Sequence, residues 1–117
     1  MADPIDSWTR AREFALTLPA TALKVGRMES VVVTDNGQFF VFEGREPDSS
    51  FAVQIDLETI DLLKETEPET YWQSKHYEGW PAVLVRYDSP DPERVQRVIR
   101  LGYEQARAKK PARRRNG

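Results

Sequence analysis

The sequence predicts an α+β domain, a two-layer sandwich in which an antiparallel or mixed sheet carries helices on one face. Two observations lead to this fold class. The chain has 117 residues, which suits one domain of ordinary size. Its helix and strand patterns follow one another in the order α-β-β-β-β-α-β-β-α, so most strands are neighbours in sequence and do not alternate with helices. We expect the domain to span residues 1–106, followed by a flexible basic tail at 107–117.

A helix is expected first, and it ends before Pro19, which cannot continue it. Its apolar residues are spaced three and four positions apart, as one face of a helix requires: Trp8, Ala11, Ala15 and Leu18. Either Asp3-Pro4 or Asp6-Ser7 is suited to cap it, because a short oxygen-bearing side chain accepts hydrogen bonds from the free amides of the first turn.

Strands are expected next. The ranges Thr21–Val25, Ser30–Thr34 and Gln38–Phe42 are rich in β-branched or aromatic residues. Asp35-Asn36-Gly37 separates the second range from the third and suits a tight hairpin turn, because these residues tolerate a positive φ. In Phe51–Ile55 the apolar side chains alternate, which is typical of a strand with one face on the core.

A second helix is expected over Leu57–Thr66, with Asp56 as its N-cap and Pro68 closing it. Its acidic side chains recur on one side of the helix and are Glu58, Asp61 and Glu65. A solvated face explains this spacing better than a metal site or a general acid does, because charged runs on a helix usually face water.

The strongest strand pattern is Ala82–Tyr87, which follows an aromatic stretch that is either extended or looped. If Val83 and Val85 face the core, alternation along the strand turns Arg86 to the other side of the sheet. A third helix is expected to begin within Ser89–Glu93, where prolines suit a first turn whose amides are unpaired in any case.

The composition excludes several kinds of chemistry. The chain has no cysteine, so disulfides, thiolate metal sites and cysteine nucleophiles are excluded. Its single histidine, His76, rules out a multi-histidine zinc site. The sequence contains neither a glycine-rich phosphate loop nor a serine in a nucleophile elbow. We therefore expect no enzymatic activity, no catalytic residue, no metal site and no cofactor.

Neither a membrane span nor a secretory signal is visible in the sequence. The longest apolar runs, Phe39–Phe42 and Ala82–Val85, have four residues, whereas about 20 are needed to cross a bilayer. The acidic start of the chain lacks the apolar segment of a signal peptide. A cytoplasmic protein that does not contact membranes is therefore expected.

The net charge of −2 conceals a division within the chain. Residues 107–117 contain six basic side chains and no acidic one, which leaves 11 basic against 19 acidic residues in 1–106, a formal charge of −8. The basic residues of this C-terminal segment are Arg107, Lys109, Lys110, Arg113, Arg114 and Arg115. A polybasic segment attracts phosphates, whereas an acidic body repels them. The alternatives are a solubilising extension that binds nothing specific and an extension that folds back on the acidic body.

The most unusual composition lies between Tyr71 and Pro81, where two Trp, two Tyr, the only His and a Lys occur together. Aromatic rings beside a cation suit base stacking, phosphate neutralisation or a flat ligand. The alternative is structural: the rings close one end of the core and His76 makes a structural hydrogen bond. A pocket formed by this stretch would be lined by Tyr71, Trp72, His76 and Trp80.

The same stretch resembles a known family. The run His-Tyr-Glu-Gly-Trp-Pro-Ala-Val-Leu-Val-Arg at 76–86 is similar to the signature of the MmcQ/YjbR-like family, in which such a run precedes the last helix. The similarity extends to Phe14–Pro19, Asp56–Glu69 and Tyr103–Ala106, and so covers about residues 8–110. The resemblance implies a frataxin-like (CyaY-like) fold, also described as a double wing, and a DNA-binding function without enzymatic activity or cofactor.

This sequence departs from the family in two places. Relatives usually carry a Trp-Gly pair after the first helix and a Lys that opens the third strand, whereas this chain has Lys24–Arg27 and Gly37–Phe39 there. The loss of a lysine from the expected wing hairpin makes that surface less suited to DNA.

Non-enzymatic DNA binding is the leading hypothesis. The expected contacts are Lys75, His76 and Arg86 near the motif, and Lys109, Lys110, Arg113, Arg114 and Arg115 in the basic segment. The binding should be weak and salt-dependent, because it rests on phosphate contacts. The alternative is a small-molecule or protein-binding domain that uses the aromatic pocket. A third hypothesis is an acidic ridge that binds metal cations weakly and consists of Glu58, Asp61, Glu65, Glu67 and Glu69. The sequence leaves the oligomeric state open.

Overall fold

The computed structural model describes residues 3–27, 29–46 and 48–111. Within these residues the elements follow the expected order and are α1 (Trp8–Leu16), β1 (Thr21–Val25), β2 (Ser30–Thr34), β3 (Phe39–Phe42), β4 (Ser50–Gln54), α2 (Leu57–Thr66), β5 (Tyr71–Trp72), β6 (Ala82–Arg86) and α3 (Pro92–Ala108). The strands form one sheet in the order β1-β2-β3-β4-β6-β5, and every neighbouring pair is antiparallel. This arrangement confirms the predicted fold class.

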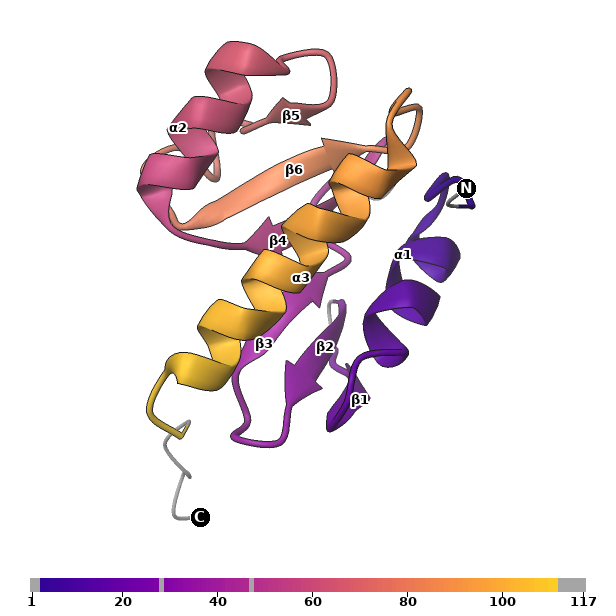
Figure 1. Ribbon diagram of the computed structural model, residues 1–117, viewed down its shortest axis with the longest axis vertical. Helices are drawn as coiled ribbons and strands as arrows, with labels where there is room; N and C mark the ends of the chain where they lie inside the picture. The colour runs from indigo at the N-terminus through magenta and orange to yellow at the C-terminus, as the bar shows by residue number, and fades with distance from the viewer. Residues whose placement is uncertain (1–2, 28, 47, 112–117) are drawn as a thin grey trace.

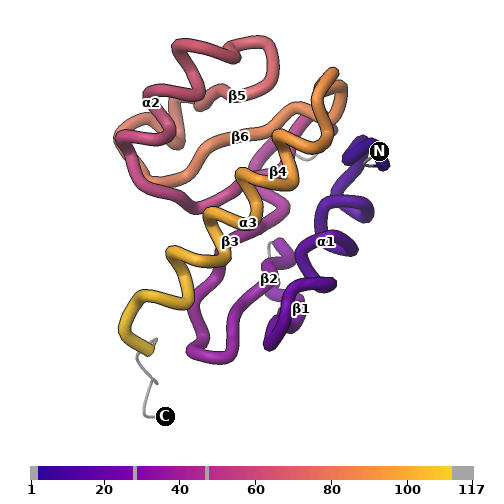
Figure 2. The backbone as a smooth tube through the Cα atoms, in the orientation of Figure 1, coloured from indigo at the N-terminus to yellow at the C-terminus, as the bar shows by residue number. Residues whose placement is uncertain are grey.

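The helices cover one face of the sheet. Helices α1 and α3 lie in front of the strands in Figure 1, and α2 lies beside β5 and β6 at one end of the long axis. The tube in Figure 2 shows α3 crossing the sheet diagonally toward the opposite end. The main core fills the space between helices and sheet, where Ile60, Phe51 and Ile99 are almost fully buried. Among the described residues, no helix combines the length and the apolar character that a membrane span requires.

Short side chains begin each helix, as the sequence predicts. Ser7 and Asp56 accept hydrogen bonds from the free amides of α1 and α2, and Asp91 does the same for α3. Helix α3 begins at Pro92, where a missing N–H costs nothing. It continues to Ala108, two residues beyond the expected end of the domain at residue 106, because Ala106 in its last turn is still packed in the core.

A β-bulge in β3 changes which side chains reach the core. Val32 is opposite Val41 and Val33 is opposite Phe39, so one residue of β3, Phe40, has no partner on β2. Phe40 and Val41 therefore both face the helices, while Phe39 and Phe42 face the other side of the sheet. The sequence pattern did not reveal this irregularity.

The sheet face away from the helices is also partly covered. One row of directly opposed residues points to this open face and consists of Lys24, Val31, Phe42, Ala52, Leu84 and Trp72. Ala52 and Leu84 are nevertheless fully buried, because the segment between β5 and β6 folds back over them and packs Tyr77 on them. Residues 73–81, named here the aromatic loop, thus form part of a second, smaller core.

Candidate ligand groove on the open face of the sheet

A groove lies on the open face, between the β2–β3 hairpin and the aromatic loop. Its volume is about 370 Å³, and its lining consists of Glu29, Val31, Phe39, Phe42, Arg45, Gln54, His76, Tyr77, Trp80, Pro81 and Ala82. The groove lies where β3 begins, β4 ends and β6 begins, since Gln54 is paired with Ala82 and the amide of Ile55 donates to the carbonyl of Pro81 (3.0 Å). Three separate parts of the chain therefore build it.

Aromatic rings dominate the walls of the groove. Phe39 packs edge-to-face on Phe42, with ring centroids 5.4 Å apart, and His76 packs in the same way on Tyr77 at 4.9 Å. Trp80 is 63 % exposed and Phe39 is 38 % exposed, which is unusual for rings of this size. The groove therefore offers apolar ring surface that the protein itself does not cover.

Gln73 holds the aromatic loop in place. Its Nε2 amide lies within hydrogen-bond distance of three carbonyls of the loop and of β6: Tyr77 (3.0 Å), Trp80 (3.0 Å) and Ala82 (2.8 Å). Its Oε1 accepts from Nζ of Lys64 on α2 (3.0 Å). Gly79 adopts a φ of +81°, which glycine reaches without strain and which lets the loop turn back toward the sheet. One side chain thus determines the path of the segment that carries His76 and Trp80.

Two acidic side chains around the groove are hydrogen-bonded within the protein, whereas among the described residues a basic one is not paired with an acidic group. The carboxylate of Glu29 accepts from the amide of Gly44 (3.2 Å), and that of Glu43 accepts from the amide of Ser30 (3.4 Å). Arg45 lines the groove, and within the described part of the chain it takes part in no ion pair. The acidic groups are therefore held by the backbone, whereas this cation is available to a ligand.

The pKa of Tyr77 reflects its burial and the charges around the groove. Burial raises the pKa of its hydroxyl, the nearby carboxylate of Glu29 raises it further, and a hydrogen bond with the backbone of Arg45 opposes both effects. The raised pKa means that the Tyr77 hydroxyl keeps its proton more strongly than a free tyrosine does.

The structure brings together two of the four residues expected to line a pocket. His76 and Trp80 line the groove. Tyr71, by contrast, is 1 % exposed and belongs to the core between helices and sheet, so its inclusion in the pocket was wrong. Trp72 points to the open face but lies outside the groove, where its Nε1 donates to Oγ of Ser50 (3.0 Å). Consecutive strand residues face opposite sides, so Tyr71 and Trp72 never shared a pocket.

The basic residues expected near the motif are spread over the open face. Arg86 points away from the main core, as alternation predicts, and its guanidinium lies 4.8 Å from the centroid of the Trp72 ring. Lys75 and His76 are exposed neighbours in the aromatic loop, and only His76 lines the groove. Arg86 therefore belongs with Trp72, whereas the other two lie at the groove or next to it.

The start of the basic segment is attached to the β2–β3 hairpin. Nδ2 of Asn36 donates to the carbonyls of Ala106 (2.9 Å) and Lys109 (3.1 Å), and Nε2 of Gln38 donates to the carbonyl of Lys110 (2.8 Å). Gln38 directly precedes Phe39, a wall of the groove. The lysine side chains themselves are exposed. Arg113, Arg114 and Arg115 lie outside the described residues.

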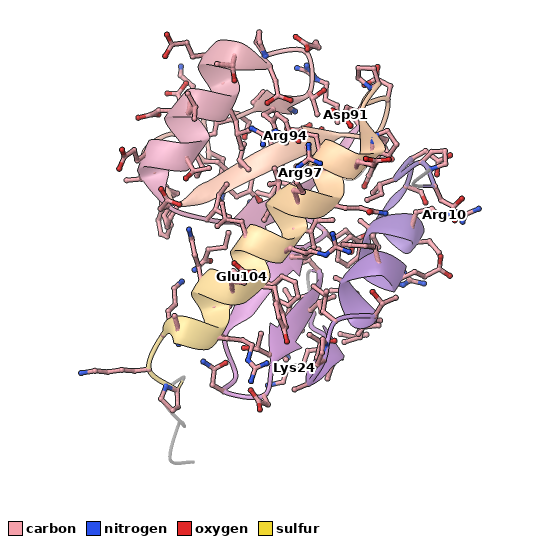
Figure 3. All side chains as sticks on the ribbon, viewed as in Figure 1. Arg10, Lys24, Asp91, Arg94, Arg97 and Glu104 are labelled. Atoms are coloured by element: carbon pink, nitrogen blue, oxygen red, sulfur yellow. The ribbon has the colours of Figure 1, made fainter. Side chains whose placement is uncertain are left out.

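Arginines also line the helix side of the molecule, where the sequence analysis had not placed a site. Figure 3 shows Arg94 and Arg97 on the first half of α3. Arg94 is bound to Glu67 (3.1 Å), Arg100 lies over the ring of Phe14, and Arg107 donates to the hydroxyl of Tyr103 (2.9 Å). Most of these cations are thus occupied by contacts within the protein.

The acidic ridge of α2 is solvated, as its spacing predicts. Glu58, Asp61 and Glu65 are all exposed. Within the described ranges, no three carboxylate or imidazole groups are arranged to hold a metal ion. The ridge lies at the end of the molecule opposite to the C-terminal end of α3 (Figure 1), so the acidic and basic ends are well separated.

Some groove residues were not singled out from the sequence. Phe39 and Phe42 are adjacent to the predicted hairpin turn, but only the bulge at Phe40 puts both on the open face. Arg45 belongs to a polar loop without any recognisable motif. Gln73 was part of the aromatic stretch, yet nothing in the sequence indicates that its amide would bind three carbonyls.

Comparison with solved structures finds this architecture in a bacterial protein. The crystal structure of Deinococcus radiodurans protein DR2400, with the family-model domain DUF419, matches with a TM-score of 0.75 over 93 % of this chain and 84 % of that chain. The two proteins share a fold. Their sequence identity is 16 %, so the match concerns the fold alone. No family model matches the chain, and no curated protein does.

Proposed function

We propose that this protein is a non-enzymatic DNA-binding module of the MmcQ/YjbR-like family, whose basic C-terminal segment provides sequence-independent affinity for phosphates. One observation carries the proposal. Lys109 and Lys110 of the basic segment are attached through their carbonyls to the β2–β3 hairpin, whose strand β3 also carries Phe39 of the groove. The hairpin thus joins exposed lysines, which suit phosphates, to exposed rings on the open face of the sheet, which suit bases.

The contacts made by the other basic residues also favour the basic segment as the phosphate-binding part. Arginines on α3 are held by Glu67, Phe14 and Tyr103, so they contribute less to a phosphate site than their number implies. The formal charge of −8 in residues 1–106 disfavours a duplex lying across the body of the protein. DNA binding of this kind is weak and falls steeply with salt.

The test is fluorescence anisotropy of labelled DNA over a salt series. The variant replaces Arg113, Arg114 and Arg115 by alanine, and the matched control replaces the same three by lysine, which keeps the charge. Removing three phosphate contacts should lower the slope of log K against log salt by roughly 2–3, while the lysine control keeps the slope of the parent. A full-length protein that binds no DNA at low salt refutes the proposal. Equal slopes for all three proteins refute the role of the basic segment.

Truncation is best placed after Pro111. Deleting all of residues 107–117 would remove Arg107, which is part of α3, and the backbone carbonyls that Asn36 and Gln38 bind. Such a deletion would confuse lost charge with lost stability. Ending the chain at Pro111 preserves every contact of the described structure.

The groove itself supports a second candidate function, a small-molecule or protein-binding domain. Its volume of about 370 Å³ lies within the range of about 300–1,000 Å³ that is usual for ligand sites. Arg45, Gln54 and His76 provide polar groups among apolar walls, which is the composition of such sites. A thermal-shift screen against aromatic carboxylates and free nucleotides tests it, and the absence of any stabilising compound counts against it.

A further inference from the structure

We propose that the groove on the open face is a stacking site for unpaired bases, so that the protein prefers single-stranded DNA to duplex. This inference rests on the proposed function and specifies the form of DNA. Its basis is the combination of uncovered rings and an available cation in one groove, together with a basic segment attached to the hairpin that carries Phe39.

The rings have the exposure that stacking requires. Phe39 and Phe42 meet at 87°, and His76 and Tyr77 meet at 83°, so neither pair is stacked face to face. Trp80, at 63 % exposed, makes no ring–ring contact within the described residues. Bases stack on such faces with little regard to sequence, because every base has a π-face. In a duplex these faces are already covered by neighbouring bases, and only base edges are available in the grooves.

The polar groups match the remaining parts of a nucleotide. Arg45 lines the groove and Lys75 precedes His76 at its side, so cations are at hand for the phosphates on either side of a stacked base. Gln54 also lines the groove, and its side-chain amide makes no hydrogen bond within the described chain, which leaves it able to contact a base edge. The acidic groups nearby are Glu29, Glu43, Glu46 and Glu78, of which Glu29 and Glu43 accept from the amides of Gly44 and Ser30.

The basic segment is attached to the same hairpin that supplies one wall of the groove. Gln38 binds the carbonyl of Lys110, and the next residue of the chain is Phe39 in the wall of the groove. Gln38 and Phe39 are consecutive residues and face opposite sides of the hairpin, so Lys109 and Lys110 are held on the side that carries α3, while the groove opens on the other face. A single strand with a base in the groove reaches these lysines by passing around the hairpin, and only a ligand that carries phosphates would gain from that contact.

The experiment measures the affinity for three labelled probes of equal length: oligothymidine, an abasic strand with the same phosphates, and a duplex. Trp80→Ala is the test variant, because so exposed a ring contributes little to the stability of the fold. Leu62→Ala, which removes another exposed apolar side chain on α2, is the matched control. For the parent protein we expect oligothymidine to bind more tightly than the other two probes at equal salt. Trp80→Ala should weaken oligothymidine binding about 5- to 100-fold and leave the abasic strand unaffected.

Tryptophan fluorescence gives a second readout. Stacking on Trp80 should quench the emission of the parent protein, and Trp80→Phe should lose this quenching while it retains most of the affinity. If DNA binds but Trp80→Ala behaves like Leu62→Ala, the inference is refuted and the proposed function stands. If no probe binds at low salt, both fail. Quenching by thymidine monophosphate at lower concentration than by oligothymidine refutes it in favour of the small-ligand candidate.

Discussion

Replacing Gln73 by alanine tests how the aromatic loop is held. The Gln73 amide has two hydrogens for the carbonyls of Tyr77, Trp80 and Ala82, so at most two of the three contacts are full hydrogen bonds. Each such bond contributes about 0.5–1.5 kcal/mol net, and the lost contact with Lys64 adds little at the surface. The free energy of unfolding should therefore fall by about 1–3 kcal/mol.

Thermal and urea denaturation followed by circular dichroism measure this change. For a domain of this size the loss corresponds to a drop in Tm of roughly 4–15 °C. Gln96→Ala is the matched control, because Gln96 makes no hydrogen bond within the described residues. Gln73→Glu should be worse than Gln73→Ala, since it replaces the donor by a carboxylate that faces three carbonyls. If Gln73→Ala and Gln96→Ala unfold at the same urea concentration, the reasoning is wrong.

Three further predictions concern stability. Gly102→Ala should lower the free energy of unfolding, measured by chemical denaturation, by up to about 2 kcal/mol, because a Cβ there would lie 2.9 Å from Cγ1 of buried Val53. This crowding outweighs the gain in helix propensity, and an increase in stability would contradict the packing. Tyr71→Phe should leave Tm unchanged or raise it, since the buried Tyr71 hydroxyl has no partner in the described residues, and DNA affinity should not change. The Gln105 side chain donates to Asp56 and lowers the pKa of that carboxyl below its usual value. The stability that the ionised Asp56 contributes is therefore present above pH 3.8 and is lost as the pH falls through the lowered pKa. Asp56→Asn should flatten the pH dependence of unfolding in that acidic range, and an unchanged profile would contradict the assignment.

Local patterns predicted most of the fold. Helix α2 begins and ends where the sequence analysis placed it, because Asp56 is a strong cap and Pro68 prevents continuation. The alternation in Phe51–Ile55 correctly assigned the core side of β4, since the side-chain period of a strand does not depend on its partners. Signals of this kind act within a few residues and are readable without the tertiary structure.

The candidate site was only partly predictable. The sequence pointed to His76 and Trp80, which do line the groove, but it grouped them with Tyr71, which faces the main core. The stretch was read as a unit because its composition is unusual, although composition does not say which side of a sheet each ring faces. Its pairing with β6 decides that, and this pairing depends on contacts between residues far apart in the chain.

By itself, the sequence determined the order of the elements, the cap of α2, and the division between an acidic body and a basic end, and it left two candidate caps for α1, of which Ser7 is the one used. These properties follow from the spacing and the charge of neighbouring residues. Only the tertiary structure decided that Phe39, Arg45 and Trp80 share one groove and that Lys110 is held at the β2–β3 hairpin. Three features bring these residues into place: the β-bulge at Phe40, the contacts of the Gln73 amide with the aromatic loop, and the contact of Asn36 with the end of α3. Each is a long-range or irregular interaction that no local sequence pattern encodes.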